Sequence, residues 1–326
     1  MSHAWTSAML RSLLPDEKSK ILLVRGTDHE LLAAGAFVKS PRSPFLRFLG
    51  NHAVPEPTYI LASDREAEGL LIKEVRRLGF PLELTRMPAD LFNPDELGSA
   101  LGRPALRVLR PEGGSPWLPL GGTWAEFEAS LPANRRSDLR RAQRKAEGHG
   151  ALTYRILTPI DDHRGHLLQR YIDLEKNSWK YDAGSAIELD EPALRFFNAL
   201  TESPLRIVFG FLEIDGVTAA GQIMLDYANS LWVLKTAFHK DFRRCSPGVL
   251  LMHEAVKFGF SQGYDAFEFL GFEEPWLQVW TRGVHSYLTV RLYTSSPHGI
   301  AALCRDGGRS LLRRINSLPR LRPQTV

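Results

Sequence analysis

One stretch of the chain, residues 230–272, restricts the fold more than any other segment. An apolar run at 231–239 is followed by the loop 240–248, which reads Lys-Asp-Phe-Arg-Arg-Cys-Ser-Pro-Gly. Apolar residues then recur at helical spacing to about residue 262, and the aromatic-rich segment 265–272 has the composition of a strand. The pattern predicts a strand, a basic loop, a helix and a second strand in that order.

The junction of this loop with its helix has the properties of an anion site. The first turn of a helix leaves backbone N–H groups without partners, and the helix dipole adds positive potential there. Ser246 can cap the helix, Pro247 suits its first turn, and Gly248 lets a ligand approach the backbone closely. With Arg243 and Arg244 just upstream, the junction favours a phosphate or pyrophosphate. The alternative is an ordinary capped helix with two solvated arginines.

Composition and charge restrict the class of protein without selecting a function. The 326 residues include 44% apolar and 24% charged residues, which is typical of a soluble globular protein with a sizeable core. The net charge of +4 suits an anionic ligand, a nucleic acid or a membrane surface. Two cysteines are too few for a disulfide scaffold or a cysteine metal site, and no apolar run approaches the ~18 residues of a membrane span. The few cysteines favour a reducing cytoplasm, and we expect no metal. The N-terminus lacks a convincing secretory signal.

Changes in pattern along the chain predict two halves with short additional ends. The first half has strand patterns at 21–24 and 59–62 and a helix capped at 63–64. Residues 88–122 are rich in Pro and Gly and are predicted to connect the halves. In the second half an antiparallel meander turns at Asp215-Gly216, a strong hairpin signal. The predicted domains are a flexible leader at 1–20, an N-terminal half at 21–120, a C-terminal half at 121–295 and a basic tail at 296–326.

A strongly basic helix is predicted at 133–147. Such a helix could present a patch to an anionic ligand, either the adenosine phosphates of a cofactor or an RNA backbone. It could equally be a solvated helix between the two halves. No signature of an RNA-binding module and no aromatic ladder accompanies it. Its positive residues are Arg135, Arg136, Arg140, Arg141, Arg144 and Lys145.

The order of these elements resembles the fold of the Gcn5-related N-acetyltransferases (GNATs). At residue level the chain is similar to the CelD-like acetyltransferase branch, which is related to the FemAB peptidoglycan transferases. The resemblance is close over 120–293 and looser over 21–120. It implies an α/β (α+β) fold with a mixed, mostly antiparallel sheet and two tandem GNAT-like halves. The matching pieces are Gly121-Gly-Thr-Trp-Ala-Glu-Phe, Asn134-Arg-Arg-Ser-Asp-Leu-Arg-Arg, Ser178-Trp-Lys with Gly184, the segment 237–251, and Gly263-Tyr-Asp-Ala-Phe-Glu-Phe-Leu-Gly.

The resemblance implies that acetyl-CoA or another acyl-CoA is a co-substrate. In this fold the strands on either side of the loop splay apart, and the pantetheine arm of coenzyme A lies in the gap. Its pyrophosphate would lie on the amides of residues 244–248. Family members often carry a lysine shortly after the last glycine, and Leu277 stands there in this chain, which puts the usual acceptor chemistry in doubt. The implied cofactor-binding residues are Arg243, Arg244, Cys245, Ser246, Pro247, Gly248 and Val249.

Acyl transfer to an amine needs one group that removes a proton from the acceptor and another that protonates the departing thiolate. Glu268, on the strand beside the gap, is the favoured base, and alternation places Asp265 on the opposite face. His239, at a strand end beside the loop, is a rival base. Tyr287 or Tyr264 is a candidate general acid. Each of these residues could instead be an ordinary strand or core residue.

Three aromatic or basic residues are predicted to shape the acceptor site: Trp179, Lys180 and Trp276. The alternative for the Trp179-Lys180 pair is a core tryptophan next to a lysine that points to water. Cys245 is interpreted as loop filling, because no His and acid partners can be placed beside it.

Three functions remain open on the sequence. The leading hypothesis is an acyl-CoA-dependent N- or O-acyltransferase, in cell-envelope or polysaccharide metabolism. The second is a FemAB-like transferase that uses aminoacyl-tRNA, suggested by the two halves and the arginine helix. The third is a non-catalytic relative that binds an anionic polymer or membrane. The acceptor is open among polysaccharide, peptidoglycan precursor, small amine and protein lysine, and we expect a monomer or homodimer.

Overall fold

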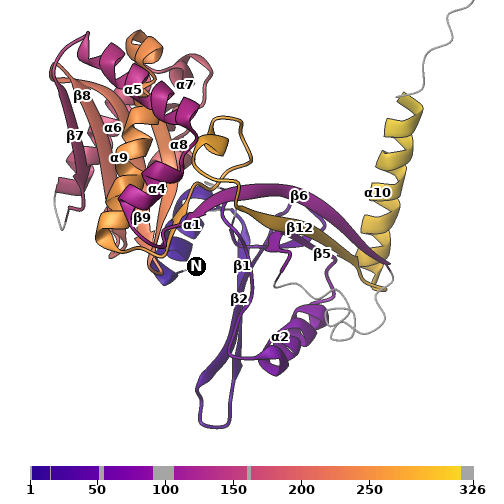
Figure 1. Ribbon diagram of the computed structural model, residues 1–326. Coiled ribbons are helices and arrows are strands. Elements are labelled where there is room, and N and C mark those ends of the chain that lie inside the picture. The colour runs from indigo at the N-terminus through magenta and orange to yellow at the C-terminus, as the bar shows by residue number, and fades with distance from the viewer. Residues whose placement is uncertain (1, 15, 51–54, 91–105, 160–162, 317–326) are drawn as a thin grey trace, which may run out of the picture. The chain divides into compact units, whose positions relative to one another are not determined.

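The protein folds into two compact units whose sequences are interleaved. The computed structural model (Figure 1) describes residues 2–14, 16–50, 55–90, 106–159 and 163–316. Unit 1 consists of Met1–Pro15, Gly50–Glu56 and Gly113–Ser286, and unit 2 consists of Asp16–Leu49, Pro57–Glu112 and Tyr287–Val326. The predicted boundary between residues 120 and 121 therefore does not separate the units, because each takes strands from both halves of the sequence.

Unit 1 is built on a mixed, mostly antiparallel sheet, as expected. Its strand order is β6-β11-β10-β9-β8-β7, and only β10 and β11 are parallel. The turn between β8 and β9 has positive φ at Asp215 and Gly216, which confirms the predicted hairpin. The strands are β6 (Leu106–Pro119), β7 (Leu152–Leu157), β8 (Arg206–Ile214), β9 (Val217–Tyr227), β10 (Ser230–Phe238) and β11 (Ala266–Glu268).

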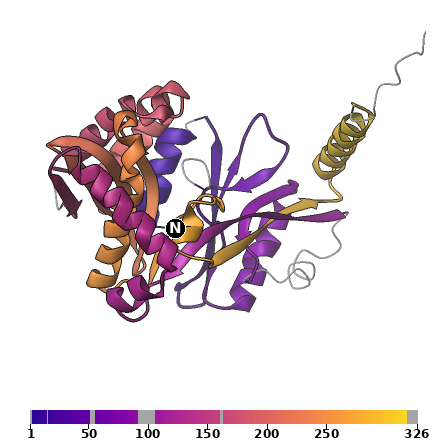
Figure 2. The ribbon, with the colours of Figure 1, turned by 45° about the horizontal axis from the view of Figure 1, so that its top comes forward.

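Helices cover both faces of this sheet (Figures 1 and 2). On one face α9 (Pro247–Gln262) packs on β8 and β9 and carries α4 (Trp124–Ser130) and α5 (Ala133–Glu147). On the other face lies α6 (His163–Lys176), with α8 (Glu191–Thr201) beside it. Alternation explains this division: a Cβ on Gly210 would point at Leu251 of α9, whereas a Cβ on Gly221 would point at Leu174 of α6.

The N-terminus is a helix rather than the predicted flexible leader. Helix α1 (His3–Leu13) is capped by Ser2 and packs on α8, and its Trp5 ring meets Phe196 edge-on at 5.1 Å. Trp5 and Met9 are buried, so their apolar surface holds the segment in unit 1. The contact with α8 joins segments nearly 200 residues apart, which the local pattern of the first residues does not show.

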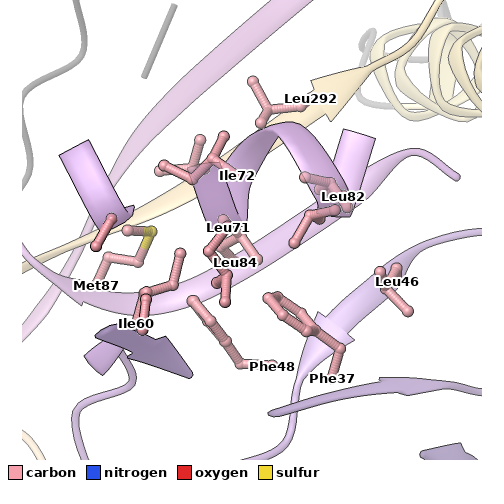
Figure 3. Packing of buried hydrophobic residues seen from close by; sticks show 14 residues of the cluster. Phe37, Leu46, Phe48, Ile60, Leu71, Ile72, Leu82, Leu84, Met87 and Leu292 are labelled. Atoms are coloured by element: carbon pink, nitrogen blue, oxygen red, sulfur yellow. The ribbon is translucent and has the colours of Figure 1, made fainter. Parts of the chain in front are cut away.

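Unit 2 has the strand order β1-β2-β3-β5-β12, with β4 paired to β2. Helix α2 packs on this sheet, and Figure 3 shows Leu71 of α2 beside Leu84 of β5 in the buried cluster. The predicted cap is confirmed, since Asp64 accepts a hydrogen bond from the amide of Ala67. The elements are β1 (Lys18–Arg25), β2 (Leu31–Lys39), β3 (Leu46–Phe48), β4 (Leu61–Ala62), α2 (Arg65–Arg77), β5 (Leu82–Pro88), β12 (Val284–Tyr293) and α10 (Pro297–Asn316).

The two units repeat one order of elements. In unit 2, β1, β2 and β3 pair antiparallel, α2 follows, and β5 returns parallel to β3. In unit 1, β8, β9 and β10 pair antiparallel, α9 follows, and β11 returns parallel to β10. The next strand is exchanged: β5 pairs with β12, and β11 pairs with β6. Part of the predicted connection, residues 106–119, is therefore strand β6, and residues 91–105 lie outside the described part.

Among the described residues, no helix is both long and apolar enough to span a membrane.

Candidate active site

The central strands of unit 1 separate at one point. β11 pairs with β10 through only three residues, and the last pair is Trp232 with Glu268. The register of β10 on β9 shifts between Val233 and Lys235, so Leu234 is a bulge that bends the strand. β10 continues to Phe238, and residues 233–238 have no partner on the β11 side within the described sheet. This leaves an unpaired row of backbone groups beyond the separation point.

The loop after β10 leads into the helix with unusual backbone geometry. It forms the 3₁₀ helix η2 (Lys240–Cys245), and Ser246 then adopts a left-handed conformation, φ 51 and ψ 51. The Ser246 side chain does not cap α9, contrary to prediction; its carbonyl instead accepts from the amides of Val249 and Leu250. The Gly248 amide forms no hydrogen bond with the described chain, so it remains available to a ligand.

A basic pocket of about 270 Å³ opens beside this junction. Arg135, Arg141 and Lys145 of α5 line one side, and Arg244 lines the other. Asp138 pairs with Arg141 at 2.7 Å and offsets part of the charge. The predicted arginine helix thus faces the predicted anion loop. The remaining lining residues are Leu139, Ala142, Ser246, Val249 and Val279.

The opposite face of α5 lines a second, larger groove of about 780 Å³. Arg136, Arg140 and Arg144 succeed one another there at one-turn spacing. Three carboxylates, Glu128, Glu147 and Glu254, line the same groove and offset the charge of the three arginines. The basic residues of α5 are therefore divided between two surfaces.

Residues 133–277 match the family model described as acetyltransferase (GNAT) domain. We refer to this matched stretch, residues 133–277, as the GNAT domain. Among solved structures, FemX is similar with TM-score 0.62 and 12% identity, over 90% of this chain and 91% of its own. L-PGS from Bacillus licheniformis is similar with TM-score 0.55 and 13% identity, over 96% of this chain and 97% of its own. The C-terminal domain (DUF2156) of a putative lysylphosphatidylglycerol synthetase from Agrobacterium fabrum is similar with TM-score 0.58 and 12% identity, over 94% of this chain and 91% of its own. These likenesses show the fold, and no curated protein sequence matches.

At the separation point a buried carboxylate lies next to a histidine. Glu268 ends β11 with 5% of its surface exposed, and its Oε1 lies 3.1 Å from Nε2 of His285. The His285 ring stacks on the Trp117 indole at 4.8 Å between centroids. Phe267 packs on the α9 side, so alternation turns Glu268 to the other face. The sequence pointed to Glu268 but not to His285, which lies 17 residues away and carries no motif.

A second buried cluster lies on the α6 side of the GNAT domain. Glu175 is 1% exposed; it accepts from the Tyr171 hydroxyl at 3.2 Å and the Ile187 amide at 2.7 Å. Lys180 lies 3.8 Å from the same carboxylate, and burial, with the like charge of Lys235, lowers its pKa to about 8. The sequence did not indicate Glu175, Tyr171 or Lys235 as partners.

Trp179 and Lys180 do not follow the alternative of a core tryptophan next to a solvent-exposed lysine. Trp179 is 52% exposed, and it is the Lys180 side chain that is largely buried. Glu274 is near enough to influence Lys180 and also accepts a hydrogen bond from Nε1 of Trp276. These contacts gather the three predicted acceptor-site residues on one side of the GNAT domain. Leu277, which the resemblance places where family members often carry a lysine, is buried in the core.

The other predicted site residues have contacts that do not involve Glu268 or His285. His239 caps η2, accepts from the Asp241 amide, and lines a separate pocket of about 400 Å³ with α6. Tyr287 belongs to unit 2, where the Arg86 guanidinium stacks on its ring, so its role as an acid stays a prediction. Cys245 is buried, which raises the pKa of its thiol, and this agrees with loop filling. Arg243 is exposed, and Tyr264 is buried in the core.

Proposed function

We propose that the GNAT domain transfers an acyl group from acyl-CoA to an amine or hydroxyl acceptor. The observation that carries this proposal is the alignment of three features: the separated strands, the open Gly248 amide and the basic pocket. A thioester arm has amides that can pair with the unpaired edge of β10. Its pyrophosphate needs cations and a helix N-terminus, which Arg244 and the start of α9 supply.

The proposed donor site has a defined polarity. The pyrophosphate would lie at the carboxyl end of β10, where η2 and α9 begin, and the arm would run back toward the bulge at Leu234. The thioester would then lie near Glu268, where the strands meet. In this arrangement the acceptor would enter on the side of Trp179, Lys180 and Trp276. A cell-envelope glycan or its precursor is the proposed acceptor class.

Calorimetric titration with acetyl-CoA, coenzyme A and ADP tests the donor. A Cβ on Gly248 would meet only Phe238, at 3.7 Å, so Gly248→Ala and Gly248→Glu should both fold. Gly248→Glu places a carboxylate where the pyrophosphate would lie, and we expect affinity to fall at least about tenfold, which corresponds to about 1.4 kcal/mol. Gly248→Ala is the matched control and should bind within a few-fold of the wild type. Folded protein that binds none of the three ligands would contradict the proposal.

A second candidate is transfer from aminoacyl-tRNA. The groove with Arg136, Arg140 and Arg144 favours it, because arginines one turn apart could contact successive phosphates. The likeness to FemX over nine-tenths of the chain agrees with it at the level of the fold. It predicts tRNA binding that weakens steeply with salt and exceeds the binding of a random polyanion. Equal retention of both polymers would exclude it, and turnover with any acceptor would exclude a non-catalytic role.

A further inference from the structure

Two strand ends bring a buried carboxylate and an imidazole together at the separation point. The Glu268 side chain is nearly inaccessible, yet its Oε2 has no hydrogen-bond partner in the described part of the chain. Its other oxygen, Oε1, lies 3.1 Å from Nε2 of His285. Burying a carboxylate destabilises the folded state unless its charge is compensated. A purely structural role would not explain why this pair is kept.

The orientation of His285 is fixed from several directions. Trp117 stacks on one face of the ring. The segment before His285 is tied to Trp117, because the Trp117 amide donates to the Gly283 carbonyl at 3.0 Å and Thr281 donates to the Trp117 carbonyl at 2.7 Å. A Cβ on Gly283 would come within 2.9 Å of that carbonyl, so only glycine fits this approach. The ring is thus held against Glu268.

This orientation determines which nitrogen can take a proton. A carboxylate accepts hydrogen bonds, so in the neutral imidazole the contact with Glu268 favours the hydrogen on Nε2 of His285. Nδ1 then bears the lone pair. The side chain is 37% exposed and no other hydrogen bond of its ring is present in the described part, so Nδ1 is open to an acceptor group.

We propose that His285 takes the proton of the acceptor and that Glu268 is a positioning residue which fixes its tautomer. This inference rests on the proposed acyl transfer. The acceptor nitrogen attacks the thioester carbon, and a C–N bond forms. Its proton passes to Nδ1, the C–S bond breaks, and the proton is delivered to the coenzyme A thiolate. The amide and free coenzyme A leave, and the imidazole returns to its neutral form.

The other candidates are less suited to this step. Glu268 itself exposes almost no surface, so it cannot contact an acceptor directly. His239 is engaged at the start of η2. Lys180 lies close to Glu175, which holds its ammonium on the α6 side. His285 lies next to Glu268, where β10 and β11 diverge, and it is both exposed and fixed in orientation.

Nitrogen-15 NMR of the full-length protein tests the tautomer without any acceptor. We expect an Nε2–H tautomer for His285 in the wild type. In Glu268→Gln the amide can present either an oxygen or an NH₂ group, so we expect a mixture of tautomers with acetyl-CoA affinity unchanged. An Nδ1–H tautomer in the wild type, or an unaltered tautomer in Glu268→Gln, would overturn the assignment.

Release of coenzyme A from acetyl-CoA, with spermidine, glucosamine or a lysine peptide as acceptor, tests the catalytic role. His285→Gln should lower kcat by about 100-fold or more with little change in acetyl-CoA affinity. His285→Ala should recover activity when imidazole is added, which a structural role would not allow. His298→Gln, which alters a histidine packed on Phe80 in unit 2, is the control. Full activity in His285→Gln would refute the role of His285, whereas absence of coenzyme A binding would refute the proposed function itself.

Discussion

Lys180 shows how burial changes the chemistry of a single residue. Removal from water disfavours the ammonium, Lys235 repels it, and Glu175 partly restores it, with the result that its pKa falls to about 8. An unfolded chain would keep the ordinary value of 10.5. Between these values the unfolded state binds more protons than the folded state, so this residue makes the free energy of unfolding rise with pH across that window.

Two substitutions should move this pKa in opposite directions. Glu175→Gln removes the charge that raises the pKa of Lys180, so the pKa should fall below about 8. Lys235→Gln removes a like charge, so the pKa should rise. Competitive labelling with acetic anhydride across pH 7–11, read by mass spectrometry, would measure both, with the half-exposed Lys257 as internal reference. Shifts of the same sign in both variants would contradict the electrostatic explanation.

At the scale of elements, glycines in the β8–β9 hairpin decide how closely helices approach the sheet. Gly221 lies under α6, where an added Cβ would come within 2.8 Å of Leu174 and 3.1 Å of Tyr171. Gly210 lies under α9, where the nearest atom is the terminal carbon of Ile156 at 3.2 Å. The buried Tyr171 ring cannot move easily, whereas the end of an isoleucine side chain can.

Substitution of these glycines should therefore have unequal costs. Gly221→Ala should lower the free energy of unfolding by about 1–3 kcal/mol, because the overpacked site must shift α6. Gly210→Ala is the matched control in the neighbouring strand and should cost clearly less. Urea denaturation of both variants provides the comparison. Equal destabilisation would show that α6 and α9 accommodate the methyl group equally well.

At the scale of the molecule, the units exchange strands, so neither half of the sequence contains a whole unit. In unit 1, β6 pairs with β11 and α1 packs on α8. The elements β6 and α1 both come from residues before 120. This explains why the predicted C-terminal domain at 121–295 is incomplete. The repeated order of elements survives in both units, but their last strands come from the other half.

A fragment of residues 121–295 should consequently fail to fold cooperatively. It lacks the strand that satisfies β11 and the helix that covers Phe196, which would expose polar backbone and apolar surface. Circular dichroism during urea titration, with the full chain as control, would measure this. A cooperative transition of the fragment would contradict the exchange as a requirement for folding.

In the full chain, Trp5→Ala should lower the free energy of unfolding by about 3–5 kcal/mol, because Phe196 loses the same cover. The same urea titration measures this change.

The sequence determined the local order of elements by itself. The helix start at Asp64, the hairpin at Asp215-Gly216 and the strand-loop-helix-strand order at 230–272 rest on capping, turn chemistry and periodicity, which act over a few residues. The resemblance supplied the GNAT fold and Glu268. These features could be predicted because their physical causes lie within short segments.

Only the tertiary structure decided which distant residues meet. The pairing of Glu268 with His285, the approach of Lys235 to the buried Lys180 and the exchange of β6 and β12 depend on contacts between segments far apart in sequence. Ser246 was predicted to cap by its side chain, but its left-handed backbone uses the carbonyl instead. Such outcomes follow from the packing of whole elements against one another, and no pattern within a single segment records that packing.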